Sequence, residues 1–152
     1  MARKTLGAVA IATALCTAPL AAEEASELFE IHCAACHNTG GIGNPGLAPP
    51  LNRPAFWQAL GEAAPAYLAG VMVSGLNGKL TIEGQVYVGL IMPPVTSATE
   101  AELAEIGTWV LQALGETGEE LTQADLTQAD LTQARATRPS HADLRAMRPV
   151  GE

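Results

Sequence analysis

One short run of residues constrains this chain more than any other: Cys33 and Cys36 stand three positions apart, and His37 follows at once. On a helix these three positions share one face, so both thiols and the imidazole point at the same object. Two thiols at this spacing reach both vinyl groups of one porphyrin, and the adjacent histidine reaches the iron as an axial ligand. The run therefore predicts one covalently attached haem c. The alternative is a pair of buried or disulfide-bonded cysteines beside an incidental histidine.

The first 22 residues are predicted to be an export signal peptide. A charged start precedes an apolar stretch over residues 6–18, which is short for a membrane span. Small residues after this stretch offer a cleavage site, so the mature chain is expected to begin at Glu23. The alternatives are an uncleaved N-terminal anchor and a lipoprotein modified at Cys16.

Cleavage of the signal leaves Cys33 and Cys36 as the only cysteines, so no disulfide framework is expected. No later stretch approaches the length of a membrane span, so stable membrane insertion of the mature chain is not expected. The formal net charge of −8 disfavours nucleic-acid binding, because phosphate backbones demand basic patches. An acidic surface favours docking onto a basic or largely apolar partner.

The mature chain is expected to divide into a compact part over residues 23–116 and a tail over residues 117–152. A β-hairpin is predicted around a two-residue turn at Glu83-Gly84, and a glycine-rich loop is predicted directly after His37. Apolar periodicity, prolines at first turns and a capping box at Thr99 predict four helices, over residues 26–37, 54–60, 65–74 and 100–115.

A second axial ligand is predicted at Met92, in the run Ile91-Met92-Pro93-Pro94. The two prolines fix an extended backbone, which would hold a sulfur over the iron rigidly. Histidine and methionine together favour ferrous iron and keep the metal six-coordinate, which suits electron transfer rather than catalysis. An iron with one open position would instead suit an enzyme or a gas-binding protein.

The other candidate ligands are expected to have other roles or to lie elsewhere. Met72 falls on the apolar face of a predicted helix and is expected in the core. Lys79 is a further candidate, whereas His141 and Met147 belong to the tail, which is not expected to enter the haem crevice.

With these residues placed, the stretch over about residues 25–115 resembles the monohaem class I cytochromes c. The resemblance implies a mainly α fold, in which short helices wrap around one covalently bound haem and a small β-hairpin is added. Cys33 and Cys36 are similar to the thioether attachment sites. His37 is similar to the proximal iron ligand and Met92 to the distal one.

The resemblance also implies two supporting contacts. Pro49 is similar to the proline whose carbonyl accepts the Nδ1 proton of His37, with Pro50 as the alternative. Phe29 and Trp109 are similar to the aromatic pair that joins the terminal helices.

A finer resemblance concerns partners. Mitochondrial cytochromes c carry a ring of lysines around the haem edge, whereas residues 23–118 contain only Arg53 and Lys79 as basic groups. Segments 75–87 and 91–94 are similar to those of bacterial cytochromes that accompany periplasmic dehydrogenases, among them sulfite, alcohol and aldehyde dehydrogenases. This resemblance implies a non-enzymatic periplasmic carrier. The carrier would be a soluble partner or a small subunit of a dehydrogenase. It would accept single electrons from that enzyme and pass them to a downstream cytochrome or terminal oxidase.

The tail opens with three similar five-residue units over residues 121–135. Three units are too few for a solenoid, and a leucine at every fifth position drifts around a helix, so a mobile or intermittently helical tail is expected. Ser140 is predicted to cap a short helix over residues 140–149, with Arg145 and Arg148 on its polar side. The hypothesis is that this helix docks on a dehydrogenase subunit.

Overall fold

The computed structural model describes residues 18–116 and 127–152. Most of the predicted export signal and the first half of the five-residue repeats lie outside the described residues. Along the described chain the elements are α1 (Ala18–His32), α2 (Ala34–His37), η1 (Thr39–Gly41), α3 (Pro54–Leu60), η2 (Gly61–Ala63), α4 (Ala64–Ser74), β1 (Leu76–Asn77), β2 (Leu80–Ile82), β3 (Gln85–Tyr87), β4 (Ile91–Met92), α5 (Glu100–Trp109), η3 (Val110–Leu114), α6 (Gln128–Thr137) and α7 (His141–Met147).

The first predicted helix is present but broken at the haem motif. Instead of one helix over residues 26–37, α1 ends at His32 and α2 begins at Ala34. Between them Cys33 has φ −125°, outside the helical range. The carbonyl of Cys33 nevertheless accepts hydrogen bonds from the amides of Cys36 and His37, at 3.2 and 3.0 Å. The chain therefore restarts its helical turn at Cys33 and keeps the motif on a helical scaffold.

Helices α1 and α5 cross, and their contact includes the predicted aromatic pair. The ring centroids of Phe29 and Trp109 lie 5.0 Å apart with a 44° angle between the planes. A capping box begins α5, because the Thr99 hydroxyl accepts from the Glu102 amide while the Glu102 carboxylate accepts from the Thr99 amide. The helix continues as the π-helical turn η3, so the predicted closing helix is confirmed with a change of winding in its last turns.

Two small antiparallel sheets follow α4. The predicted hairpin is confirmed as β2 paired with β3, and its turn residues Glu83 and Gly84 have the positive φ values that a two-residue turn needs. A second pairing was not predicted: β1 pairs with β4 and sets Leu76 opposite Met92. This pairing spans 16 residues and returns the Met92 segment to the end of α4.

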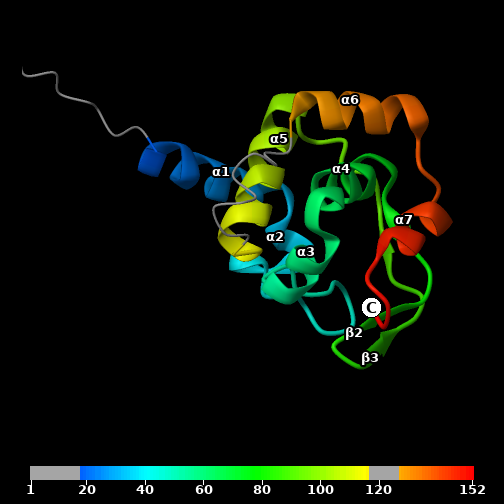
Figure 1. Ribbon diagram of the computed structural model, residues 1–152. Coiled ribbons are helices and arrows are strands. Elements are labelled where there is room, and N and C mark those ends of the chain that lie inside the picture. The colour runs from blue at the N-terminus through cyan, green and yellow to red at the C-terminus, as the bar shows by residue number, and fades with distance from the viewer. Residues whose placement is uncertain (1–17, 117–126) are drawn as a thin grey trace, which may run out of the picture.

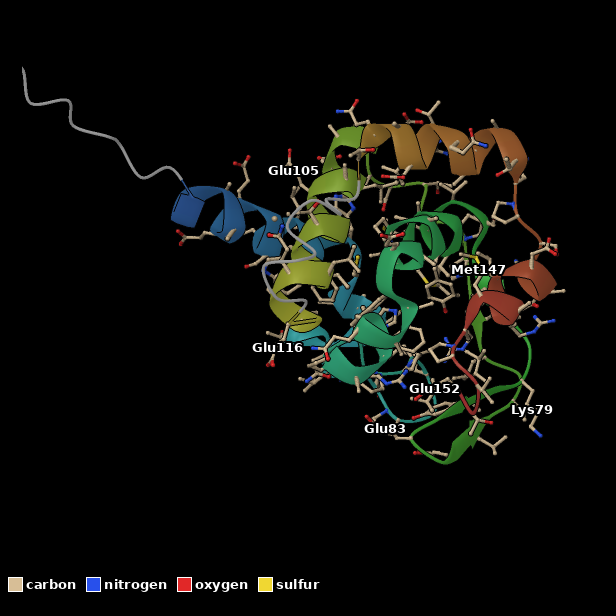
Figure 2. All side chains as sticks on the ribbon, in the orientation of Figure 1. Lys79, Glu83, Glu105, Glu116, Met147 and Glu152 are labelled. Atoms are coloured by element: carbon tan, nitrogen blue, oxygen red, sulfur yellow. The ribbon has the colours of Figure 1, made fainter. Side chains whose placement is uncertain are left out.

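The largest difference from expectation lies in residues 127–152, which we call the strap. Instead of a mobile tail, α6 and α7 pack against α4 and α5, as the orange and red ribbons of Figure 1 show. Leu131 and Leu144 of the strap are fully buried. At its far end Glu152 lies on the same side of the molecule as Glu83 of the hairpin (Figure 2).

The five-residue repeat supplies the reason for this helix. Each Leu-Thr-Gln-Ala-Asp unit contains a threonine three residues before an aspartate, which is a capping-box pattern. Thr127 and Asp130 form such a box and begin α6. Leu131 and Ala134, three residues apart, then share one buried face. The drift of a leucine repeat does not matter over so short a helix.

The predicted cap at Ser140 is confirmed, since Ser140 and Asp143 form a third capping box at the start of α7. Gly70 of α4 allows α7 to approach closely, because a Cβ at this position would lie 2.6 Å from Leu144 Cδ2. Arg148 lies beyond α7 and its side chain is buried, so its predicted place on a polar helix face is wrong. Within the described residues no helix is both long and apolar enough to cross a membrane.

We expect Leu144→Ala to lower the free energy of unfolding by about 2–5 kcal/mol, because it removes a fully buried side chain and leaves a cavity. Urea unfolding of the haem-loaded protein measures this. Val150→Ala, at a fully exposed strap position, is the matched control and should change the unfolding free energy little. Equal midpoints for both variants would mean that the strap does not pack as described.

Candidate haem site

A largely apolar cavity lies at the centre of the fold. Its walls come from α1, the motif helix α2, the proline loop over residues 47–51, α3, α4, strands β1, β2 and β4, helix α5 with η3, and the strap. This apolar lining suits an apolar ligand. The cavity brings together all five site residues that the sequence predicted: Cys33, Cys36, His37, Pro49 and Met92.

The two cysteines border the cavity and form no disulfide with each other, which was part of the alternative interpretation. Cys33 is partly buried and Cys36 is exposed. Burial, with smaller contributions from Cys36 and Glu30, raises the pKa of the Cys33 thiol to about 11. This thiol is therefore neutral at pH 7, which agrees with its apolar surroundings.

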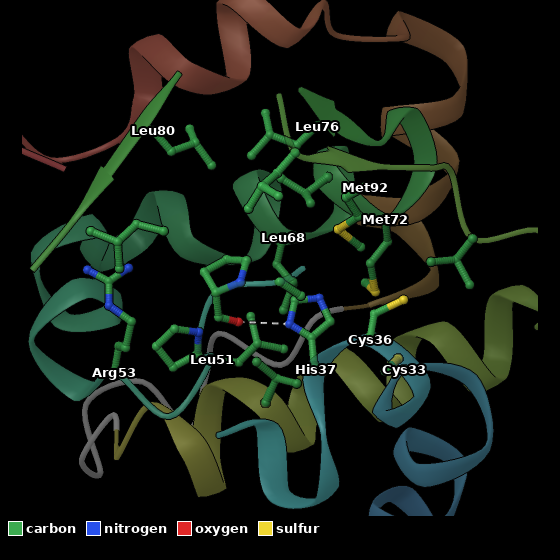
Figure 3. Close-up of a pocket in the computed structure, with 18 of the residues that line it drawn as sticks. Cys33, Cys36, His37, Leu51, Arg53, Leu68, Met72, Leu76, Leu80 and Met92 are labelled. Atoms are coloured by element: carbon green, nitrogen blue, oxygen red, sulfur yellow. Dashed lines mark hydrogen bonds between the residues drawn. The ribbon is translucent and has the colours of Figure 1, made fainter. Parts of the chain in front are cut away.

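The imidazole of His37 is buried and held in one orientation. Its Nδ1 lies 2.9 Å from the carbonyl oxygen of Pro49, the dashed line in Figure 3. A carbonyl only accepts, so Nδ1 carries the proton and Nε2 keeps a free lone pair for a metal. Burial lowers the pKa of His37, and the bond to Pro49 opposes this shift. Of the two prolines considered, Pro49 makes the contact.

The loop that supplies Pro49 depends on a glycine. Gly43 has φ +80°, and a Cβ there would lie 2.5 Å from the Pro50 nitrogen. The loop is closed by hydrogen bonds in both directions, because the Leu51 amide donates to the Gly41 carbonyl and the Gly43 amide donates to the His37 carbonyl. The glycine-rich segment thus folds back on the motif and places the Pro49 carbonyl beside His37.

Two methionines border the cavity. Figure 3 shows Met72 of α4 and Met92 of β4 close together, on the side of the cavity where Cys36 and His37 lie. Met92 is held by the β1–β4 pairing, which sets it opposite Leu76, and this close approach needs a glycine at position 75, because a Cβ there would lie 2.4 Å from the Met92 carbonyl oxygen. Met72 is 4 % exposed, as expected of a core residue, but it also lines the cavity. The other candidates, Lys79, His141 and Met147, do not line it.

Sequence reasoning missed the polar groups at the other end of the cavity. Arg53 and Arg148 line that end together with Tyr67. Both guanidinium groups are buried, and several of their N–H groups have no hydrogen-bond partner. Burial raises the pKa of Tyr67, and the nearby Arg148 opposes the shift. Haem has an apolar ring with ionised carboxylates on one edge, so an apolar cavity with unpartnered donors at one end fits this group.

The fold and the cavity define a monohaem class I c-type cytochrome. The family model described as "Cytochrome c" matches residues 22–114, and the chain belongs to this family. Members of this family bind covalently attached haem c with its iron, which confirms the predicted cofactor. The family match and the mostly helical structure together confirm the predicted mainly α fold. The matched span does not include the strap, and the predicted division into a domain over residues 23–116 and a tail stays a prediction.

Two curated relatives are both named cytochrome c-552. The first, from Thermus thermophilus, is 31% identical over 84 residues, which cover 55% of this chain and 63% of the relative. The second, from a particular strain of the same species, is also 31% identical over 84 residues and is covered to 56% of its length. The chain thus spans somewhat more than half of the relatives that it matches.

The choice of Met92 as distal ligand stays a prediction, and Met72 provides its control. We expect Met92→Ala to abolish the long-wavelength sulfur-to-iron charge-transfer band of the ferric protein and to lower the reduction potential, because a thioether favours ferrous iron. Met72→Leu should keep the band, since it preserves apolar volume beside the iron. Absorption spectra of both oxidation states measure this. A band that survives in Met92→Ala and disappears in Met72→Leu would assign the ligand to Met72.

Proposed function

We propose that this chain is a periplasmic electron carrier that takes single electrons from a dehydrogenase and passes them to a downstream cytochrome or terminal oxidase. One observation carries the proposal: the cavity presents a histidine with its Nε2 free and a methionine on a backbone fixed by pairing and prolines. Two such side chains would hold a haem iron from the chain's own residues and would leave it no open position. An iron without an open position suits electron transfer rather than substrate chemistry.

The haem supplies an iron that alternates between ferric and ferrous forms. The residues of the chain keep its surroundings nearly unchanged while it does so. The Pro49 carbonyl orients His37 and increases the electron density on its imidazole. The β1–β4 pairing holds the Met92 segment in place. The apolar walls keep water away from the iron, so little has to reorganise when an electron moves.

The cellular location is inferred from chemistry and sequence. Haem attachment to a motif such as Cys33 to His37 takes place outside the bacterial cytoplasm, and an export signal is predicted over residues 1–22. Together they support a periplasmic protein without stable membrane insertion. The acidic composition supports a protein partner and disfavours nucleic acid.

The hairpin region offers a surface for that partner. Val86 and Val88 are 52% and 72% exposed, and Ile91, next to Met92, is 71% exposed. Exposed apolar side chains beside a haem crevice favour a largely apolar partner surface, and Glu83 and Lys79 lie on the same hairpin region (Figure 2). We infer that the donor dehydrogenase docks here.

Carbon monoxide distinguishes a closed iron from an open one. If His37 and Met92 both ligate the iron, the ferrous protein should show no change in its absorption spectrum under carbon monoxide at neutral pH. The Met92→Ala variant, which opens one position, should bind the gas and is the positive control. Rapid binding by the unaltered protein would favour a gas-binding protein or a haem enzyme instead.

If the dehydrogenase docks on the hairpin region, a new negative charge there should slow electron transfer. We expect Val88→Asp to slow reduction several-fold when a periplasmic extract of the source organism is supplied with sulfite, an alcohol or an aldehyde, because a carboxylate would have to be desolvated in the contact. Ala101→Asp adds the same charge at an exposed position of α5. This helix lies away from the hairpin in Figure 1, so the rate should stay unchanged. Stopped-flow spectroscopy at low ionic strength measures both rates. Equal rates would place the docking surface elsewhere.

A further inference from the structure

Two arginines from distant parts of the sequence meet at one end of the cavity. The side chains of Arg53 and Arg148 are each 6% exposed. Their guanidinium carbons lie 4.7 and 4.8 Å from the centroid of the same ring, that of Phe56. Two like charges buried so close together require anionic partners.

The partners within the chain do not satisfy this need. Glu152 contacts Arg53 and lies 3.8 Å from Arg148 Nη2, while Glu83 lies 3.8 Å from Arg53 Nε but is 72% exposed. Tyr67 accepts one hydrogen bond, from Arg148 Nη1 at 2.7 Å. Among the described residues, Arg53 Nε and both Nε and Nη2 of Arg148 remain buried without a hydrogen-bond acceptor. Unmet buried donors on charged groups are costly, so an acidic acceptor is missing from this end of the cavity.

The covalent structure of the haem indicates which acceptor this is. In haem c the two thioether-forming positions lie on neighbouring pyrroles, and two propionate carboxylates lie on the remaining pair. Attachment at Cys33 and Cys36 therefore turns the propionates toward the opposite end of the cavity. Figure 3 shows Arg53 at the end that faces away from both cysteines. Guanidinium and carboxylate groups form the strongest hydrogen bonds available to protein side chains.

We propose that the strap is part of the haem site: it supplies Arg148, which binds the haem propionates together with Arg53. Glu152 of the strap does not line the cavity, but its carboxylate pairs with Arg53 and lies 3.8 Å from Arg148, which keeps the two guanidinium groups together. Arg148 follows directly after α7, whose Leu144 is fully buried, so packing of the strap fixes its position. The inference rests on the haem c of the family and not on the identity of the electron donor.

The proposal predicts a change in reduction potential. A positive charge beside the propionates offsets their negative charge, which would otherwise stabilise ferric iron. We expect Arg148→Gln to shift the ferric–ferrous equilibrium toward the ferric form by about tenfold, which corresponds to about 59 mV for a one-electron couple. Arg148→Lys keeps the charge and should remain near the potential of the unaltered protein.

Arg138→Gln is the matched control, because Arg138 is an exposed strap arginine that does not line the cavity. Redox titration of the haem-loaded proteins measures all three variants, and the sulfur-to-iron band reports separately whether the axial ligands are intact. A potential in Arg148→Gln equal to that in Arg138→Gln would overturn the proposal, even if the variant were less stable.

A second measurement decides the question if Arg148→Gln does not accumulate with haem. Redox difference infrared spectra of protein carrying ¹³C at the propionate carboxyl carbons identify the bands of these groups. In Arg148→Lys the labelled carboxylate bands should shift, because an ammonium cannot reproduce the forked guanidinium bond. The same bands should stay unchanged in Arg138→Gln. Unshifted bands in Arg148→Lys would show that Arg148 does not bind the propionates.

Discussion

The rest of the structure depends on one apolar cavity, which most elements of the fold border. A span of about 95 residues buries only a modest core by itself, so the folded chain is organised around the space for its cofactor. Motif helix, proline loop, α4, strands and strap all contribute walls to the same cavity. The His37–Pro49 hydrogen bond then fixes the orientation of the one nitrogen that faces the metal. The cavity therefore determines both how the helices and strands pack and how His37 is oriented.

The parts of this site that could be predicted join residues that lie close together in the sequence. The His37–Pro49 bond joins residues 12 apart, the Thr99 capping box spans three residues, and the hairpin turn needs two residues with positive φ. The contact of His37 with Pro49 was implied by the resemblance to the class I cytochromes c. The capping box and the turn depend on local backbone chemistry, which residue types reveal directly. The distal methionine was predicted for the same reason, from the prolines beside Met92. The β1–β4 pairing that holds this segment was not predicted, because two-residue strands carry no alternating pattern.

The strap was missed because its signals are long-range. Arg148 contacts Tyr67 across 81 residues, and Glu152 contacts Arg53 across 99. A repeat with a leucine at every fifth position does not predict a continuous apolar face on a helix. A helix as short as α6 or α7 can nevertheless dock with one or two buried side chains, as Leu131 and Leu144 show. A signal was present in Gly70, a glycine inside an apolar helix, which is costly unless another element approaches closely. An isolated glycine of this kind does not tell which element approaches.

The buried arginine pair makes the strap and the cofactor energetically interdependent. Without the propionates, docking of the strap buries Arg148 with several unmet donors, which opposes docking. With them, the same donors gain strong acceptors, so bound haem stabilises the packed strap. Coupling between two equilibria is reciprocal, and the packed strap must therefore stabilise the haem in its cavity by an equal free energy. The strap, which lies outside the family match, thus acts on the iron through the charge beside the haem propionates and not through a bond to the metal.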